Sequence, residues 1–148
     1  MKQLLFNGTA LEAMTADGLR TFPHECCGFL FGTEHAEHRE FTEILVVDNS
    51  STPHAERRFE ISPADYMRAE RKALASGLDL LGVYHSHPSC PAVPSIHDLR
   101  VALPTFSYVI MSVYGEGLAT IRSWQLNASN IFSEETILNK IPKPWQTS

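Results

Sequence analysis

The chain has 148 residues, of which 43% are hydrophobic and 20% charged, and its formal net charge is -5 at pH 7. This length and composition are typical of one globular domain and exclude a disordered chain. The acidic balance, without a stripe of Lys and Arg, argues against nucleic acid as a partner, and no apolar run approaches the roughly 20 residues that span a membrane.

The cysteines and the N-terminus together predict a cytoplasmic protein. The three cysteines form no disulfide-framework spacing, which suits a reducing compartment. The first residues lack the apolar core of a signal peptide. Of the three thiols, Cys90 is the one that would matter to a site, because it lies between His87 and Ser95.

The first half of the chain alternates helical and strand patterns. Apolar residues at three- and four-residue steps predict a helix that Pro23 ends. Short apolar runs then predict strands, and a polar, proline-containing stretch predicts a loop before a further short strand. In chain order these predictions cover residues 9–22 (helix), 26–32 and 40–47 (strands), 48–57 (loop) and 58–62 (strand).

The second half begins with a helix-start signal, Ser62-Pro63-Ala64-Asp65, and this helix should run to about Ser76 and stop at Gly77. A central strand, a second capped helix and a hairpin around Gly115-Glu116-Gly117 should follow. The ranges are 78–86, 95–103, 106–114 and 118–126. This order predicts an α/β fold, a mixed sheet with helices packed on it, in one domain over residues 1–138 with a loosely attached tail over 139–148.

The stretch from His85 to Asp98 predicts a metal site. In a strand, His85 and His87 project from the same face. The proline-rich connection over residues 88–94 cannot continue a strand or a helix, so it turns the chain back and brings Asp98 into the first turn of the next helix. Two imidazoles and a carboxylate leave the fourth position of a tetrahedral zinc open, as in catalytic sites. We therefore predict one Zn²⁺ per chain.

Each part of this pattern also has an ordinary structural interpretation. A His-x-His pair occurs by chance, and Ser95-x-x-Asp98 alone is a helix capping box. The combination favours a metal, because a cap does not require a preceding His-x-His-Pro. A hydrolytic site also needs a proton carrier, and Glu25, next to the strand over 26–32, is the candidate, although composition alone does not separate it from other acids.

The sequence resembles the JAB/MPN metalloproteases, the JAMM family, whose signature is a distant Glu, His-x-His-Pro, six residues and Ser-x-x-Asp. This chain has His85-Ser86-His87-Pro88, six residues, and Ser95-x-x-Asp98, with Glu25 upstream. The resemblance implies that His85, His87 and Asp98 bind zinc and that Glu25 is the general acid/base. It also implies that Ser95 helps to hold the scissile carbonyl oxygen as it becomes negative.

The resemblance further implies a curved mixed β-sheet flanked by helices, an MPN domain similar to the cytidine deaminases. Family members cut peptide or isopeptide bonds after the Gly-Gly tail of ubiquitin-like proteins; for small prokaryotic members the implied substrates are adducts of β-grasp sulfur-carrier proteins. The short connection from Leu99 to Tyr108 lacks the insertion that larger relatives use to grip a second ubiquitin.

Two other functions are consistent with the same sequence. One is a non-catalytic MPN-type interaction module, which the complete ligand set disfavours. The other is a different reaction at the same metal site, by another hydrolase or by an iron oxygenase with two histidines and one carboxylate. The sequence gives no indication of the oligomeric state.

Overall fold

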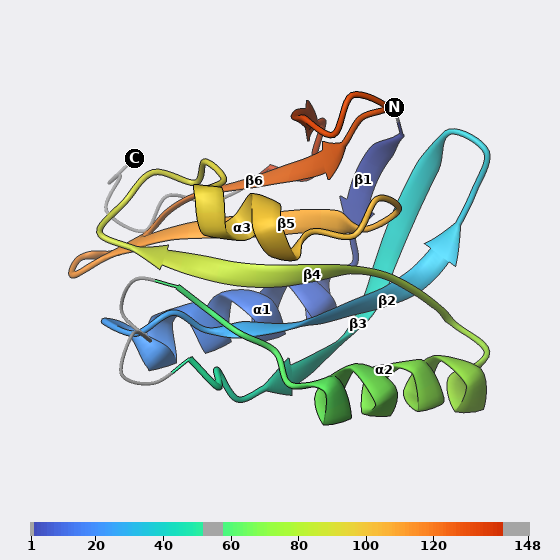
Figure 1. The fold of residues 1–148 in the computed structure, drawn as a ribbon, viewed down its shortest axis with the longest axis horizontal. Coiled ribbons are helices and arrows are strands. Elements are labelled where there is room, and N and C mark those ends of the chain that lie inside the picture. Colours follow the sequence, from blue (N-terminus) through green and yellow to red (C-terminus); the bar gives the residue numbers. More distant parts are fainter. Residues whose placement is uncertain (1, 52–57, 141–148) are drawn as a thin grey trace.

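The structure, a computed structural model, describes residues 2–51 and 58–140. These residues form three helices and seven strands (Figure 1). The helices are α1 (Gly8–Thr21), α2 (Pro63–Ser76) and α3 (Ile96–Val101). The strands are β1 (Gln3–Phe6), β2 (Cys27–Glu34), β3 (His38–Val47), β4 (Asp79–Pro88), β5 (Ser107–Tyr114), β6 (Gly117–Leu126) and β7 (Phe132–Glu135).

The strands form one mixed sheet in the order β1-β3-β2-β4-β5-β6-β7. The pairs β1–β3 and β4–β5 are parallel, and the others are antiparallel. The sheet curves until its edges nearly meet: the Leu4 amide donates to the Thr136 carbonyl at 2.8 Å, and the Leu138 amide donates to the Leu4 carbonyl at 2.8 Å. The predicted mixed α/β architecture is therefore confirmed, with β4 as the central strand.

Helices α1 and α2 cover opposite faces of this sheet (Figure 1). Met14 of α1 is fully buried in one apolar core together with Tyr84 of β4. Ala69 of α2 belongs to a second core that contains Val83 of β4. Neighbouring residues of β4 thus point into different cores, and by the same alternation His85 and His87 share the face of Val83.

The residues that cap helices α2 and α3 are those predicted from the sequence. The Ser62 side chain accepts a hydrogen bond from the Asp65 amide, and Gly77 ends α2 in the left-handed conformation, with φ 71°. Ser95 caps α3 in the same way, but this helix ends at Val101, earlier than predicted. None of the described helices is long and apolar enough to cross a membrane.

The predicted strand over residues 58–62 is wrong, because this segment bonds to the irregular residues that follow β3 and not to a strand. The Glu60 amide donates to the Asn49 side chain at 3.0 Å, and the Glu60 carbonyl accepts from the Ser50 amide at 2.9 Å. Residues 52–57 of the predicted loop lie outside the described residues, as do residues 141–148 of the predicted tail. Asn139, where that tail begins, exchanges two hydrogen bonds of 2.7 and 2.9 Å with the Phe6 backbone.

Candidate metal centre

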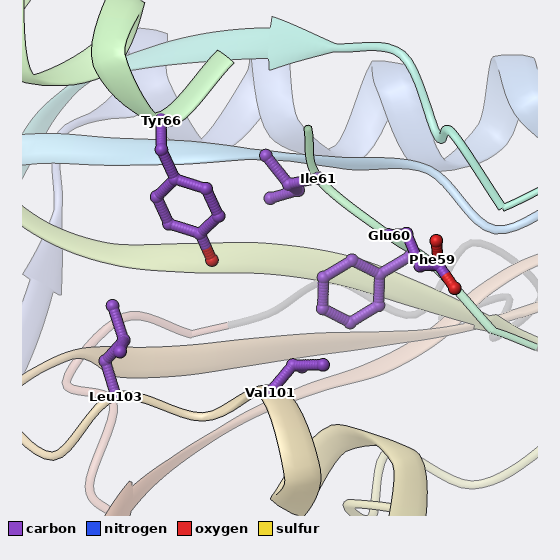
Figure 2. Close-up of a pocket in the computed structure, with 6 residues that line it drawn as sticks. All are labelled: Phe59, Glu60, Ile61, Tyr66, Val101 and Leu103. Carbon is purple, nitrogen blue, oxygen red and sulfur yellow. The ribbon is translucent and has the colours of Figure 1, made fainter. Parts of the chain in front are cut away.

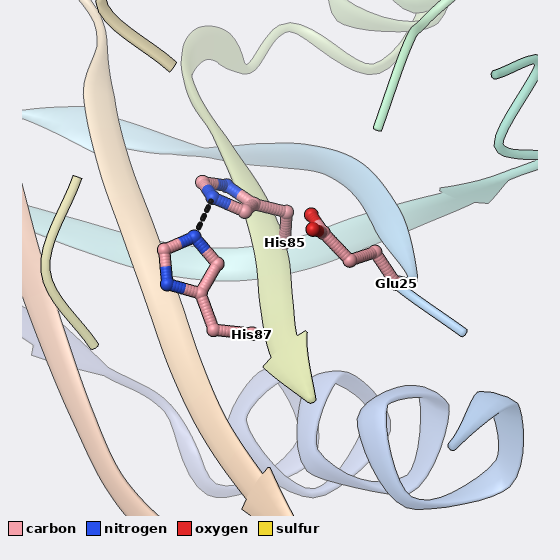
Figure 3. A group of neighbouring side chains, drawn as sticks. All are labelled: Glu25, His85 and His87. Atoms are coloured by element: carbon pink, nitrogen blue, oxygen red, sulfur yellow. Dashed lines mark hydrogen bonds between the residues drawn. The ribbon is translucent and has the colours of Figure 1, made fainter. Parts of the chain in front are cut away.

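The two histidines lie near the end of β4 and are buried, with 0% of His85 and 8% of His87 exposed. Their rings face each other, and their Nε2 atoms are 3.1 Å apart (Figure 3). Phe59 stacks on the His85 ring with centroids 4.3 Å apart. This packing leaves the His85 ring little freedom to turn away from His87.

The loop after β4 returns to the histidines because the sheet holds it. The Ser89 amide donates to the Val113 carbonyl at 2.7 Å, and Trp124 Nε1 donates to the Ala92 carbonyl at 3.1 Å. Further along, the loop leads into α3, whose first turn carries Asp98. The chain reversal predicted from the prolines is therefore present.

One carboxylate oxygen of Asp98, Oδ2, both caps helix α3 and faces the two histidines. The Asp98 amide donates to Ser95 Oγ at 3.1 Å, and Asp98 Oδ2 accepts from the Ser95 amide at 2.8 Å. This Oδ2 atom is also 3.3 Å from His85 Nε2 and 3.2 Å from His87 Nε2. The capping box and the candidate metal site are thus one structure, in which the cap aims the carboxylate.

The tautomer of His87 leaves Nε2 available as a ligand. His87 Nδ1 is 2.9 Å from the Pro91 carbonyl, which can only accept, so Nδ1 carries the proton. In the neutral ring, the Nε2 lone pair then points toward Asp98 and His85. A backbone carbonyl that fixes the ring in this way is a common feature of metal-binding histidines.

The three atoms form a triangle slightly smaller than the one that the ligands of a tetrahedral zinc ion form. Its sides are 3.1, 3.2 and 3.3 Å. Zinc bonds of about 2.0–2.2 Å at tetrahedral angles give ligand separations of about 3.3–3.6 Å. Such close electron-rich atoms repel one another unless a metal ion or a proton lies between them. The donor set of His85, His87 and Asp98 therefore fits a metal ion.

Glu25 lies beside this triangle, and its carboxylate points toward the histidines (Figure 3). Glu25, His85 and His87 form a buried group whose ligand atoms lie within 4.8 Å of one another, so this group could also contact a metal. The Cys26 amide donates to Ser86 Oγ at 2.9 Å, and the Ser86 amide donates to the Cys26 carbonyl at 3.2 Å, so the residue next to Glu25 is held against β4.

Glu25 is 4% exposed, and its Oε1 atom has no hydrogen-bond partner among the described residues. Burial raises the pKa of Glu25 to about 8; His87 opposes this shift and Asp98 adds to it. A carboxyl group whose pKa lies near neutrality can both take and return a proton.

The other pKa shifts favour an ionised Asp98 and a neutral His85. Burial favours the neutral form of Asp98, but the two histidines and the Ser95 amide hold the pKa of Asp98 well below its usual range. Burial lowers the pKa of His85. For His87, burial acts in the same direction, but the bonds to Asp98 and the Pro91 carbonyl outweigh it and raise the pKa.

Two grooves lie near the triangle. The first, of about 490 Å³, is mostly apolar (Figure 2). It is connected to the site through Phe59, which stacks on His85. Its lining residues are Phe59, Glu60, Ile61, Tyr66, Val101 and Leu103. The second, of about 370 Å³, is the Glu25 cleft, which is lined by Glu25, His87, Pro88, Cys90, Pro91, Val93 and Ser95.

All five residues predicted from the sequence belong to this region, but two supporting residues, Phe59 and Asn49, were missed. Phe59 packs on His85, and its carbonyl is 2.9 Å from His97 Nε2, which ties it to α3. Asn49 Nδ2 donates to the Glu25 carbonyl at 3.2 Å and to the Arg58 carbonyl at 3.0 Å. No local pattern marks Asn49 or Phe59, since their roles come from contacts across the fold.

The fold and much of the sequence are shared with known proteins. A desampylase of Pyrococcus furiosus is 30% identical over 114 residues, which are 77% of this chain and 75% of that protein. A probable TtuB-protein conjugate cleaving protease of Thermus thermophilus is 32% identical over 105 residues, covering 71% and 67%. A CysO-cysteine peptidase of Mycobacterium tuberculosis is 25% identical over 124 residues, covering 83% and 82%.

Two solved structures are also similar to this chain. The solution structure of a protein from Desulfitobacterium hafniense has a TM-score of 0.82 at 26% identity and covers 95% of both chains. One from Salinibacter ruber has a TM-score of 0.70 at 33% identity and covers 99% of this chain and 97% of that one. The family model for prokaryotic homologs of the JAB domain matches residues 9–127. The chain therefore belongs to the prokaryotic JAB-domain family.

Proposed function

We propose that this protein is a zinc-dependent hydrolase that cuts the peptide or isopeptide bond after the C-terminal Gly-Gly tail of a ubiquitin-like or sulfur-carrier protein. The observation that carries the proposal is the triangle of His85, His87 and Asp98, with the buried carboxyl group of Glu25 beside it. The names of the relatives, a desampylase, a conjugate cleaving protease and a CysO-cysteine peptidase, support hydrolysis of this kind of bond.

In this proposal His85, His87 and Asp98 hold one Zn²⁺, and Glu25 is not a ligand. Asp98 Oδ2 already lies at ligand spacing from both imidazoles and is fixed by the Ser95 amide. Glu25, whose pKa is raised to about 8, is better suited to carry a proton. Bound zinc would supply a Lewis acid and a water whose pKa is lowered to about 7.

The remaining groups have separate tasks. Glu25 takes a proton from the attacking water and returns it to the leaving amine. Ser95 Oγ accepts from the Asp98 amide, so its own proton is free to be donated to the carbonyl oxygen of the substrate. This donation strengthens as the oxygen becomes negative, which is where it lowers the barrier.

The apolar groove beside Phe59 suits the acyl part of such a substrate (Figure 2). An extended tail that enters there would reach the triangle from the side of His85, and it would bind through backbone hydrogen bonds in the manner of an added strand. Only glycines would then pass where the walls approach the metal. The connection from Val101 to Ser107 is short and contributes no lid to this groove.

The test is a pair of adducts on one sulfur-carrier protein, ending in Gly-Gly or in Ala-Ala before the bond to be cut. The zinc-loaded protein is incubated with each adduct, and cleavage after the tail is measured by the intact mass of the carrier protein. We expect cleavage of the Gly-Gly adduct alone. Equal cleavage of both would exclude the narrow channel and, with it, this substrate class.

The non-catalytic module and a different reaction at the same metal remain the alternatives. A module has no use for a buried carboxyl group without a partner, so Glu25 favours the enzyme. Failure to cleave any adduct, with zinc bound, would favour the module. The likeness to cytidine deaminases, the domain limits of 1–138 and the cytoplasmic location remain predictions.

A further inference from the structure

We propose that Asn49 is a positioning residue of this site, whose side-chain amide holds the backbone of Glu25 in place beside the triangle. The inference rests on the proposed function and adds to it the residue that places the proton carrier. Asn49 acts through Glu25 and not on the substrate, since the residues that the structure describes along the two grooves near the triangle do not include it.

The register of the sheet brings Asn49 opposite Glu25. Strands β2 and β3 run antiparallel, and the residue pair that ends their ladder on this side is Cys27 with Val47. Two residues further along each chain, the same register sets Glu25 against Asn49. The contact there is made by the side chain of Asn49, whose Nδ2 donates to the Glu25 carbonyl at 3.2 Å. The side-chain amide thus adds one bond where the backbone ladder has ended.

The same amide is anchored on the segment that packs on a candidate ligand. Asn49 Nδ2 also donates to the Arg58 carbonyl at 3.0 Å, and Asn49 Oδ1 accepts from the Glu60 amide at 3.0 Å. Phe59, which lies between these two residues, stacks on the His85 ring with centroids 4.3 Å apart. One side chain therefore sets the place of the proton carrier relative to a residue that holds His85.

All four hydrogen-bonding positions of this amide are used. An asparagine side chain has two N–H donors and an oxygen that accepts two bonds. The donors bond to the two carbonyls, and Asn49 Oδ1 accepts from the amides of Ser51 and Glu60 at 2.9 and 3.0 Å. Two carbonyls on one side and two amides on the other fix the orientation of the group. No other side chain of this size can make the same four bonds.

Glu25 depends on this support because its side chain is weakly held. Its carboxylate points toward the histidines (Figure 3), and Oε1 has no hydrogen-bond partner among the described residues. On the other side, the Cys26 amide donates to Ser86 Oγ at 2.9 Å. Proton transfer requires hydrogen-bond distance, and a misplacement of about 1 Å costs about 100-fold in rate. Release of the Glu25 carbonyl should therefore slow turnover and leave the metal in place.

Hydrogen exchange tests this support without substrate. In the zinc-loaded parent protein, the Cys26 amide should exchange slowly, because it is bonded to Ser86 Oγ in the segment that Asn49 holds. Asn49→Ala should speed this exchange about tenfold, which is the effect of one lost hydrogen bond. Zinc content after dialysis should not change. Unaltered exchange at Cys26 would overturn the proposal.

Two further variants separate this effect from a general loss of stability. Asn49→Asp keeps the size of the side chain and the acceptor for Ser51 and Glu60 but removes both donors, so it should speed exchange at Cys26 and leave Glu60 protected. Asn127→Ala is the matched control, since Asn127 Oδ1 also accepts two backbone amides, at 2.9 and 3.2 Å, after β6. Equally fast exchange at Cys26 in the Asn127→Ala protein would overturn the proposal.

Turnover then tests whether Asn49 acts through Glu25. The Gly-Gly adduct of the sulfur-carrier protein is incubated with an excess of zinc-loaded protein, which gives the cleavage rate and the concentration at half-maximal rate. Asn49→Ala should lower the rate about 100-fold and change that concentration less than about twofold. In the Glu25→Gln protein, the same change should lower the remaining rate less than about twofold, because the group that it places is absent. An equal loss in both backgrounds would overturn the positioning role.

The two arms distinguish this inference from the proposed function. Faster exchange at Cys26 in the Asn49→Ala protein, without cleavage of any adduct by the parent, would keep the contact that holds Glu25 and overturn the hydrolase. Cleavage by the Asn49→Ala protein at the parent rate would keep the hydrolase and overturn the positioning role.

Discussion

Two buried polar clusters lie toward opposite ends of β4, and they differ in whether the chain completes them. Near the start of β4, the Arg39 cluster has its own cation. Arg39 is 6% exposed, pairs with Glu34 and donates to Ser107 Oγ at 2.9 Å. Ser107 and Ser123 in turn donate to Glu135 at 3.2 and 2.9 Å. Every carboxylate here therefore finds a partner within the protein.

The cluster at the end of β4 contains two carboxyl groups and two imidazoles and, in the part of the chain that the structure describes, neither a Lys nor an Arg that pairs with them. Among the described residues, no Lys or Arg forms an ion pair with Asp98 or Glu25. Glu25 Oε1 remains buried without a hydrogen-bond partner beside the triangle. An unpaired buried carboxyl oxygen is costly, so its presence in this cluster favours a site that takes a ligand. Burial alone therefore does not mark a site, since Glu135 is as buried as Glu25 but has its partners within the protein.

The largest expected effect is loss of the metal. Asp98→Ala removes one corner of the triangle, so bound zinc should fall from about one per chain to almost none. Metal content after dialysis measures this. Asp65→Ala is the matched control, since Asp65 holds the equivalent position in α2. It should keep its zinc and lose about 0.3–1 kcal/mol of stability. Full zinc in the Asp98→Ala protein would show that another carboxylate is the ligand.

Next in size is the contrast between two buried glutamates. Glu25→Gln should keep zinc and fold but lower the turnover about 100- to 10,000-fold, because it removes the proton carrier. Glu135→Gln should leave the turnover unchanged and lower the free energy of unfolding by about 1–3 kcal/mol, because it disturbs a satisfied hydrogen-bond network. Steady-state kinetics and denaturant unfolding separate the two. If Glu25→Gln retained half of the parent activity, Glu25 would have no part in proton transfer.

A smaller effect is expected for the hydroxyl group of Ser95. Ser95→Ala should lower the turnover about 10²- to 10³-fold with little change in substrate binding, since its donation matters most as the oxyanion forms. The change also removes a helix cap, which costs about 0.5–2 kcal/mol. Ser62→Ala removes the equivalent cap of α2 and controls for this loss. An equal loss of activity in both variants would show that Ser95 acts only as a helix cap and not on the oxyanion.

The core of the site could be predicted from the sequence because it is local. His85, His87 and Asp98 lie within one strand, loop and helix start, and each of these elements has its own signal. Glu25 is 60 residues from His85 in sequence. Its place before the strand over 26–32 made it a candidate, but its role was predicted only from the family resemblance. Likewise, the ends of α2 were predicted from its cap and Gly77, whose conformations depend on neighbouring residues alone.

The parts that were missed depend on closure of the sheet. Strands β1 and β7 are four residues each, too short for a pattern, and they are held where Leu4 meets Thr136 and Leu138. The Arg39 cluster joins strands from both halves of the chain, so no stretch of sequence contains it. Asn49 fixes Glu25 by a contact that only the folded chain creates.

A milder test uses pH to remove the metal. Zinc requires neutral imidazoles, so protons compete with it. Hydrogen bonds to Asp98 and the Pro91 carbonyl overcome burial and raise the pKa of His87 above 6.5, whereas burial lowers that of His85. His87 is therefore protonated first, and the zinc affinity should fall about tenfold per pH unit below its pKa. Competition with a chromophoric chelator measures this. A zinc affinity that stays the same between pH 8 and pH 5 would exclude His87 as a ligand.

The metal-free protein should respond to pH with the opposite sign. Burial raises the pKa of Glu25 from 4.5 to about 8, and the pKa of His87 is raised as well, so the folded state binds these protons more tightly than the unfolded chain. Stability gained in this way is present at low pH and is lost as the pH rises through the folded pKa values. His85, whose pKa is lowered, opposes the effect at one site only.

Between about pH 5 and 8 the Tm of the metal-free protein should therefore fall, while that of the zinc-loaded protein rises as its metal binds more tightly. Glu25→Gln should flatten the metal-free curve. Parallel curves with and without zinc would mean that the triangle does not bind the metal.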